Sequence, residues 1–134
     1  MYFGEDNTIK GANVQSYLLE KSRVVSIATG ERTYHAFYAL IASKKYNTKS
    51  VKDYKFLSKS NCFTAAGVDD AQNFTDINNA MESIEFEKSE QNKIWLLLKA
   101  ILEIGNIEFD GKPNKENHEK PCKIVKKDDL KSIS

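Results

Sequence analysis

The strongest constraint on the fold is a stripe of apolar residues at helical spacing. In "KSEQNKIWLLLKAILEIGN", residues 88–106, apolar side chains recur every three or four positions, at Ile94, Leu97, Leu98, Ile101 and Leu102. This spacing places them on one face of an α-helix, which needs a core to cover it. We expect Ser89 to cap the start of this helix, and Gly105 to end it in the left-handed conformation.

Two further segments carry the same helical period. "TGERTYHAFYALIAS", residues 29–43, predicts a helix with Glu31 in its first turn, where a carboxylate favours the positive end of the helix dipole. Its apolar positions are Tyr34, Phe37, Tyr38 and Ile41. "GVDDAQNFTDINNAMESIEF", residues 67–86, predicts a helix capped by Asp69 or Asp70. Its apolar positions are Phe74, Ile77, Met81 and Ile84.

Strand signals are confined to the ends of the helical region. Tyr2 and Phe3, the turn-forming residues 4–7 and the stretch Ile9–Leu19 predict a β-hairpin, which is marginal in water without further cover. Residues 107–109 predict a short extended piece. The Lys-rich connection 43–63 is expected to be polar, with Tyr54, Phe56 and Leu57 anchoring it to the core.

These elements predict an α+β fold, mainly helical, in one partial domain. We divide it into a hairpin over 1–22, a helical subdomain over 30–109, a surface loop over 110–123 and the start of a further helix over 124–134. The short first strand and the unfinished last helix suggest that both ends are cut.

The composition excludes several classes of function. The formal net charge of +1 among 134 residues does not favour a nucleic-acid partner. No apolar run approaches the roughly 20 residues of a membrane helix, and the N-terminus does not resemble a secretory signal. We therefore expect a cytoplasmic protein whose Cys62 and Cys122 are reduced. His118 and Cys122 form one possible ligand pair, so no metal site is expected.

No catalytic motif is present. The sequence has no G-x-x-x-x-G-K-[ST] phosphate loop, no G-x-G-x-x-G, no H-E-x-x-H and no nucleophile elbow. Asp69-Asp70 is the nearest approach to a catalytic carboxylate pair, and helix capping explains it better. His35, within the first predicted helix, is expected to be a partly buried structural residue rather than a catalyst. We expect no catalytic residue in this chain.

Several stretches together resemble a known family. "YLLEKSRVV" (17–25), "GERTYHAFY" (30–38), "GVDDAQNF" (67–74) and "EQNKIWLLLKAILEIGNIEF" (90–109) are similar to successive landmarks of the myosin motor domain, in that family's order and near its spacing. "YKFLSKSNC" (54–62) also resembles that family's tyrosine-rich segment before a cysteine. The resemblance extends from about Tyr2 to Phe109, and more loosely to the end.

The resemblance implies the upper actin-binding subdomain and one transducer hairpin of a larger P-loop motor head. It implies an actin-activated ATPase that uses Mg-ATP and works on the cytoskeleton. The phosphate loop and both nucleotide switches lie outside the matching region, so the chain alone is expected to bind no cofactor and to be inactive. Implied partners are the actin filament and the remainder of the head, with light chains and cargo bound through regions outside this sequence.

The resemblance also gives a role to the charges around residues 20–35. The stretch 9–22 becomes the transducer strand, and a coupling corner forms where it meets the first helix. The corner consists of Glu20, Lys21, Arg23, Glu31, Arg32 and His35. Two interpretations remain open: the charges transmit sheet distortion during the motor cycle, or they only hold the corner in place.

The loop at 110–123 occupies the place of a myosin loop that faces actin. Lys112, Lys115, Lys120 and Lys123 would steer the protein toward an acidic filament, although plain solvation of these side chains is an equally good explanation. Two departures from the family bear on subclass: Glu103 stands where histidine is common, and Ser-Ile-Ala-Thr precedes the first helix. The alternative function is a truncated myosin-like protein that acts as a non-enzymatic actin-binding or interaction module.

Overall fold

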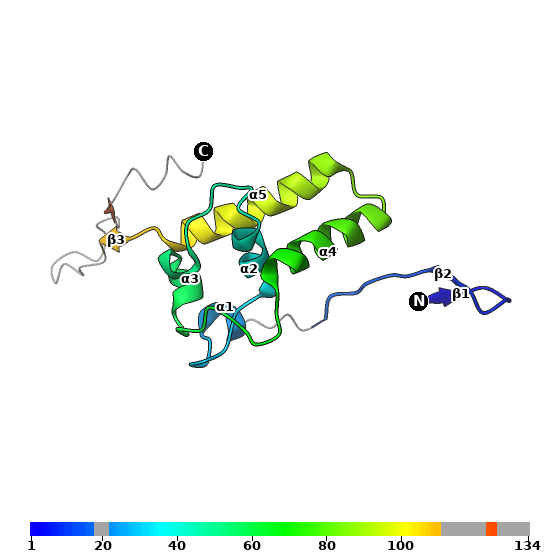
Figure 1. Cartoon of the computed structure of the whole chain (residues 1–134), viewed down its shortest axis with the longest axis horizontal. Coiled ribbons are helices and arrows are strands. Elements are labelled where there is room, and N and C mark those ends of the chain that lie inside the picture. Colours follow the sequence, from blue (N-terminus) through cyan, green and yellow to red (C-terminus); the bar gives the residue numbers. More distant parts are fainter. Residues whose placement is uncertain (18–21, 111–122, 126–134) are drawn as a thin grey trace, which may run out of the picture.

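The computed structural model describes residues 1–17, 22–110 and 123–125 (Figure 1). In chain order its elements are β1 (Tyr2–Phe3), β2 (Ile9–Gly11), α1 (Ser22–Val25), α2 (His35–Ala42), the 3₁₀ turn η1 (Val51–Asp53), α3 (Lys55–Ser58), α4 (Asp70–Ser83), α5 (Lys88–Gly105), β3 (Phe109–Asp110) and β4 (Lys123–Ile124). A short hairpin therefore precedes a helical region, which confirms the predicted α+β, mainly helical class.

The N-terminal hairpin is shorter than predicted. β1 pairs with β2 in antiparallel register, Tyr2 opposite Gly11 and Phe3 opposite Ile9, and lies apart from the helices (Figure 1). The strand expected over 9–22 ends at Gly11, residues 12–17 have no regular structure, and Ser22–Val25 is helical. A strand this long needs a neighbour of equal length to bond its backbone, and β1 has only two residues.

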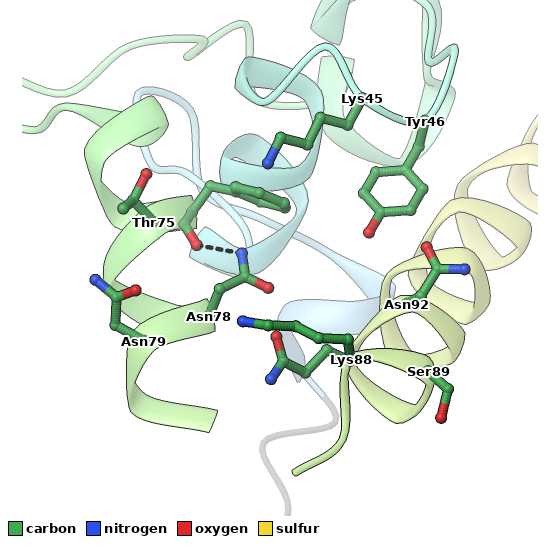
Figure 2. A pocket seen from close by; sticks show the side chains of 10 residues that line it. Lys45, Tyr46, Thr75, Asn78, Asn79, Lys88, Ser89 and Asn92 are labelled. Atoms are coloured by element: carbon green, nitrogen blue, oxygen red, sulfur yellow. Dashed lines mark hydrogen bonds between the residues drawn. The ribbon is translucent and has the colours of Figure 1, made fainter. Parts of the chain in front are cut away.

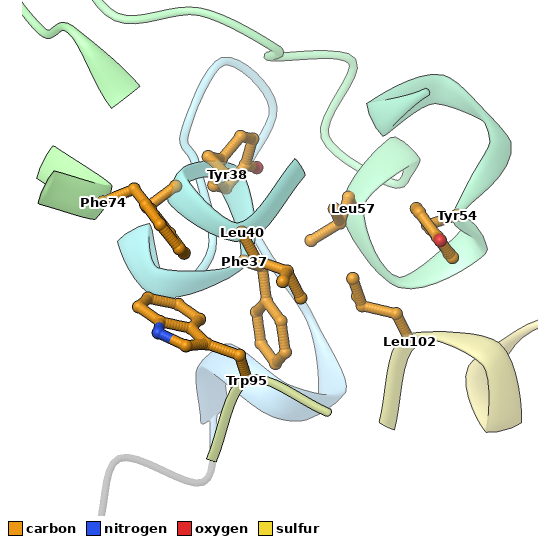
Figure 3. Packing of buried hydrophobic residues seen from close by; sticks show 9 residues of the cluster. Phe37, Tyr38, Leu40, Tyr54, Leu57, Phe74, Trp95 and Leu102 are labelled. Carbon is orange, nitrogen blue, oxygen red and sulfur yellow. The ribbon is translucent and has the colours of Figure 1, made fainter. Parts of the chain in front are cut away.

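The core lies where α2 and α3 meet the two long helices α4 and α5 (Figures 1 and 3). Its buried apolar residues are Phe37, Tyr38, Ala39, Leu40, Tyr54, Leu57, Phe74, Trp95 and Leu102. Four consecutive residues of α2 belong to it, so this short helix is covered on every side rather than along the predicted stripe alone. Tyr54 and Leu57 are fully buried, and Phe56 packs against the core edge-to-face with Phe37, as expected for anchors of the connection 43–63.

Helix α2 begins later than predicted. Gly30 has φ +85°, and Tyr34 is an extended N-cap with φ −62° and ψ 129°, so the helical residues start at His35. A left-handed residue cannot lie inside a right-handed helix. Glu31 therefore lies outside the helix, and the prediction that it faces the helix dipole is wrong.

The ends of α4 and α5 are set by side chains. Asp69 caps α4 by accepting hydrogen bonds from the backbone of Ala71 (2.9 Å) and Gln72 (3.0 Å), which leaves Asp70 available for another role. The N-cap of α5 is Glu87 rather than Ser89, because Glu90 reaches back to accept from the Glu87 backbone at 2.9 Å.

Helix α5 ends at Asn106 instead of at a left-handed glycine. Gly105 is the last helical residue and Asn106 is a right-handed C-cap. The Asn106 side chain accepts from the Lys55 backbone (2.8 Å) and donates to the Asp53 carbonyl (2.8 Å). These bonds hold the end of α5 against η1 and α3, so this helix end does not need a left-handed residue.

After α5 the chain forms a second small hairpin in place of a single extended piece. Phe109 pairs with Ile124 and Asp110 with Lys123. Ile124 thus lies in a strand and not at the start of a helix. Residues 111–122 of the predicted surface loop and residues 126–134 of the predicted last helix lie outside the described residues.

Candidate coupling site

Arg32 is the centre of the predicted corner. Its guanidinium Nη2 donates to both carboxylate oxygens of Asp70, at 2.7 and 2.8 Å, and its Cζ lies 3.7 Å from the centroid of the Tyr38 ring. The Arg32 side chain is almost fully buried, and that of Asp70 is 19% exposed. This contact joins the segment before α2 to the first turn of α4, across 38 positions of sequence.

The burial of Arg32 makes this contact sensitive to change. Among the described residues, Arg32 Nε and Nη1 and the Thr33 hydroxyl have no hydrogen-bond partner. The Asp70 carboxylate and the face of the Tyr38 ring therefore compensate most of the desolvated charge. Loss of the Asp70 carboxylate would leave a buried cation without a counter-charge, and loss of the Tyr38 ring would remove its cation–π contact, so the corner favours one arrangement strongly.

Arg23 and Glu31 form an outer layer around this centre. Arg23 Nη1 donates to the Arg32 carbonyl at 2.9 Å and lies 3.7 Å from Glu31 Oε2. The Glu31 side chain is largely exposed, so this ion pair contributes little to stability on its own. Arg23 matters more for geometry than for stability, because its hydrogen bond to the Arg32 carbonyl holds α1 beside the start of α2.

The predicted corner is therefore only partly assembled within the described residues. Arg23 and Arg32 meet, but Arg23 lies on a short helix and not at the end of a strand. His35 is the exposed first residue of α2, contrary to the expectation of partial burial. Glu20 and Lys21 lie outside the described residues.

Asp70 was not predicted to belong to the corner. The sequence indicates it only as an alternative to Asp69 for the cap of α4. The Asp69-Asp70 doublet was the sequence feature that could have indicated this role. One carboxylate suffices for a cap, and a second acid beside it is free to bind a buried cation. Its partner was not predictable, because Arg32 is remote in sequence.

A shallow hollow of about 460 Å³ opens beside the corner. Its lining includes Arg23, Glu31, Arg32, His35 and Cys62. Within the described residues, no group of three or more His, Cys, Asp and Glu side chains could hold a metal ion. The charged groups of this hollow include Arg23 and Arg32, whose contacts position the backbone before α2.

A second polar cluster lies at the other end of the core. The Tyr54 hydroxyl donates to Glu103 Oε1 at 3.1 Å and accepts from the Lys49 backbone at 3.1 Å, while Lys49 Nζ lies 3.6 Å from Glu103 Oε2. Burial, with a smaller contribution from the Glu103 charge, raises the pKa of Tyr54 to about 12. Glu103, the residue that departs from the family's histidine, is thus a buried carboxylate with two partners.

A cavity of about 700 Å³ lies between α4 and α5 (Figure 2). Asparagine amides and two lysines dominate its lining. Asn78 is committed to the protein, because it donates to the Phe74 carbonyl (2.6 Å) and accepts from the Trp95 indole (3.0 Å). Lys88 is paired with Glu82 at 2.6 Å. This cavity was not predicted, and its polar groups mainly stabilise the helix pair.

The predicted actin-facing lysines fall largely outside the structure. Lys112, Lys115 and Lys120 are not among the described residues, and neither are His118 and Cys122. Only the backbone of Lys123 is described, in β4. Among the described residues, no helix is both long and apolar enough to cross a membrane.

Comparison with known proteins decides the family. The family model described as "Myosin head (motor domain)" matches residues 1–134, the whole chain. The chain belongs to the myosin head family. It is 42% identical over 127 residues to Myosin-1 of Arabidopsis thaliana, with 90% of this chain and 11% of that protein covered. This confirms the resemblance drawn from the sequence landmarks.

Other myosins match at similar levels. The chain is 36% identical over 140 residues to Myosin-J heavy chain of Dictyostelium discoideum, with 100% of this chain and 6% of that protein covered. It is 44% identical over 112 residues to Myosin-51 of Schizosaccharomyces pombe, with 79% of this chain and 8% of that protein covered. The chain thus spans about a tenth or less of the length of these myosins.

Proposed function

We propose that this chain is the coupling and actin-facing segment of a myosin motor, an actin-activated ATPase that converts ATP hydrolysis into movement along actin filaments. The observation that carries this proposal is the match of the myosin head model to all 134 residues of a chain that spans about a tenth of its relatives. Such a chain corresponds to one segment of a motor, and its chemistry depends on the segments around it.

The residues present indicate which role would belong to this chain and which to the rest of the head. The sequence has no phosphate loop, so Mg-ATP would bind to other parts of the head, and this chain alone would hydrolyse no ATP. Its own contribution would be mechanical. The contact of Arg32 with both carboxylate oxygens of Asp70 joins two parts of the chain: the segment between the hairpin and α2, and helix α4. A displacement of that segment would therefore reach the helical subdomain as a rigid movement.

The same proposal assigns partners and location. Actin would be met by the loop with Lys112, Lys115, Lys120 and Lys123, and the remainder of the head would contact the hairpin and α5. Light chains and cargo would bind through other regions of the polypeptide. The protein would act in the cytoplasm on the cytoskeleton.

The proposal is tested by grafting the chain into a related motor. The matching segment of the Myosin-J head of Dictyostelium is replaced by these 134 residues, since the match covers the whole chain. Steady-state ATPase activity is then measured with and without actin filaments. We expect activation by actin in the grafted head and no hydrolysis by the chain alone. A grafted head that folds and remains inactive would contradict the motor proposal.

The alternative function, a non-enzymatic actin-binding module, has its own measurement. Co-sedimentation of the 134-residue chain with actin filaments is compared with that of a variant in which Lys112, Lys115 and Lys120 are glutamine. Salt-sensitive binding that depends on these lysines, together with an inactive grafted head, would favour the module. Binding that the substitutions leave unchanged would exclude this loop as the contact.

A further inference from the structure

Helix α5 has two apolar faces, and only one of them is covered by the residues that the structure describes. On the inner face Trp95 and Leu102 are buried (Figure 3). Leu98, on the same face, is partly buried against the core. On an outer face Ile94, Leu97, Ile101 and Ile104 are between 37% and 62% exposed. At about 100° per residue, the centres of the two faces lie roughly 120° apart around the helix. We call these four residues the outer stripe.

The spacing of the outer stripe indicates what fits it. Its residues are separated by three, four and three positions, which is the alternation of a coiled-coil seam. Such a stripe is narrow, and it accepts the side chains of one facing helix at a small crossing angle. A helix that packs on a sheet or in a globular core usually presents a wider apolar face.

Exposure of this stripe is unusual for a complete domain. A helix that is apolar on most of its circumference is typical of the interior of a larger protein. Contiguous exposed apolar patches on soluble proteins commonly mark interaction sites. Within the described residues no element covers Leu97, which is 62% exposed at the middle of an 18-residue helix.

We infer that the outer stripe is the docking face for an amphipathic helix from the part of the myosin head that lies outside this chain. This inference rests on the proposed function. The occupant is argued from length: the myosins that this chain resembles are about ten times longer, so a partner helix would be supplied by the same polypeptide. Docking would then be intramolecular and would need only a modest apolar contact. The partner helix should present apolar residues at the same spacing of three and four.

The chain offers a matched pair of residues for the test. Leu96 and Leu97 are adjacent leucines on the same helix, both exposed, at 46% and 62%. Leu97 lies in the outer stripe, whereas Leu96 points roughly 100° away from it. The same substitution at either position therefore changes hydrophobicity and helix propensity equally. A difference in its effect between the two positions measures the contribution of the outer stripe.

Photo-crosslinking in the grafted Myosin-J head identifies the occupant. A diazirine-bearing amino acid replaces Leu97 or, as the control, Leu96, and crosslinked peptides are identified by mass spectrometry. We expect position 97 to crosslink within the same head to a helical segment outside the 134 residues, and position 96 to give at least fivefold less product. Crosslinks between two heads would identify a second copy as the occupant. That result, or equal yields at 96 and 97, would overturn the inference.

Polar substitution gives an independent measurement. Leu97→Gln should lower the unfolding temperature of the grafted head by a few degrees, and Leu96→Gln should leave it nearly unchanged. In the isolated chain neither substitution should lower it, because the stripe is uncovered there. Equal effects in head and chain would contradict docking. Neither measurement requires ATPase activity, so an inactive head with a specific crosslink would refute the motor proposal and leave the docking face standing.

Discussion

At the scale of single residues, the candidate coupling site depends on one buried cation and its two compensating groups. Arg32 is bonded to Asp70 and stacked on Tyr38, and two of its nitrogens have no partner among the described residues. The ion pair of Arg23 with Glu31 lies at the surface and is far weaker. The corner is therefore held mainly from the α4 side.

Asp70→Asn is expected to destabilise the chain strongly. The substitution keeps the shape of the side chain but leaves the buried guanidinium without a counter-charge, a loss of about 3 kcal/mol. Asp69→Asn is the matched control, because asparagine is as good an N-cap as aspartate and position 69 does not contact Arg32. Chemical denaturation of both variants measures the difference. Equal stabilities would show that the Arg32 contact has little energetic weight.

Tyr54 should give a pH-dependent stability. Because its pKa is raised to about 12 in the folded chain, against about 10 when unfolded, folding favours the protonated hydroxyl. This contribution is complete below pH 10 and is lost between pH 10 and 12. Tyr54→Phe should remove that part of the alkaline loss of stability. Thermal unfolding across this pH range checks it, and an unchanged profile in the variant would refute the assignment.

Glu103→Gln separates the two causes of the Tyr54 shift. Burial is the larger cause and the Glu103 charge a smaller one. The pKa of Tyr54 should therefore fall in this variant and still remain above 10. Ultraviolet titration of tyrosinate, with Tyr54→Phe to identify the signal, measures it. A fall to the ordinary value would mean that the Glu103 charge and not burial dominates.

At the scale of elements, the apolar period predicted the three longer helices. It did not predict where α2 begins, where α5 ends or which of their apolar faces are covered. Phe37, Phe74 and Leu102 were placed correctly because a buried stripe repeats with the helix. The exposure of Ile94, Leu97 and Ile101 was not predictable, since a sequence shows that a face is apolar and not which neighbour covers it. The ends of α2 and α5 depend on the Gly30 conformation and on bonds from Asn106 to remote backbone atoms.

The cap of α4 provides a test at this scale. Asp69→Ala removes the acceptor for the backbone groups of Ala71 and Gln72 and should cost about 1 kcal/mol. Asp69→Asn should cost little, because the amide oxygen accepts the same bonds. The free energy of unfolding of the two variants decides it. A large loss in the asparagine variant would indicate that the charge, rather than the hydrogen bonds, stabilises α4.

At the scale of the whole molecule, the chain has the properties of a part. Its hairpin carries exposed Tyr2, Phe3 and Ile9, and α5 carries the uncovered outer stripe. The landmarks from 17 to 109 made the family recognisable from sequence, and the match of the myosin head model over the whole chain confirms it. The composition of the corner was not predictable to the same degree, because Glu20 and Lys21 were assigned to it by resemblance, and the contact of Arg32 with Asp70 depends on the packing of α4.

The most direct test of the coupling claim is the actin activation of ATPase activity in the grafted Myosin-J head carrying Asp70→Asn, with Asp69→Asn as its control. The measurement is made at a temperature where both heads remain folded. If the corner transmits movement, the Asp70 variant retains its basal rate and loses most of its activation by actin, and the control retains both. Full activation in the Asp70 variant would contradict the account and leave the corner as a purely structural joint.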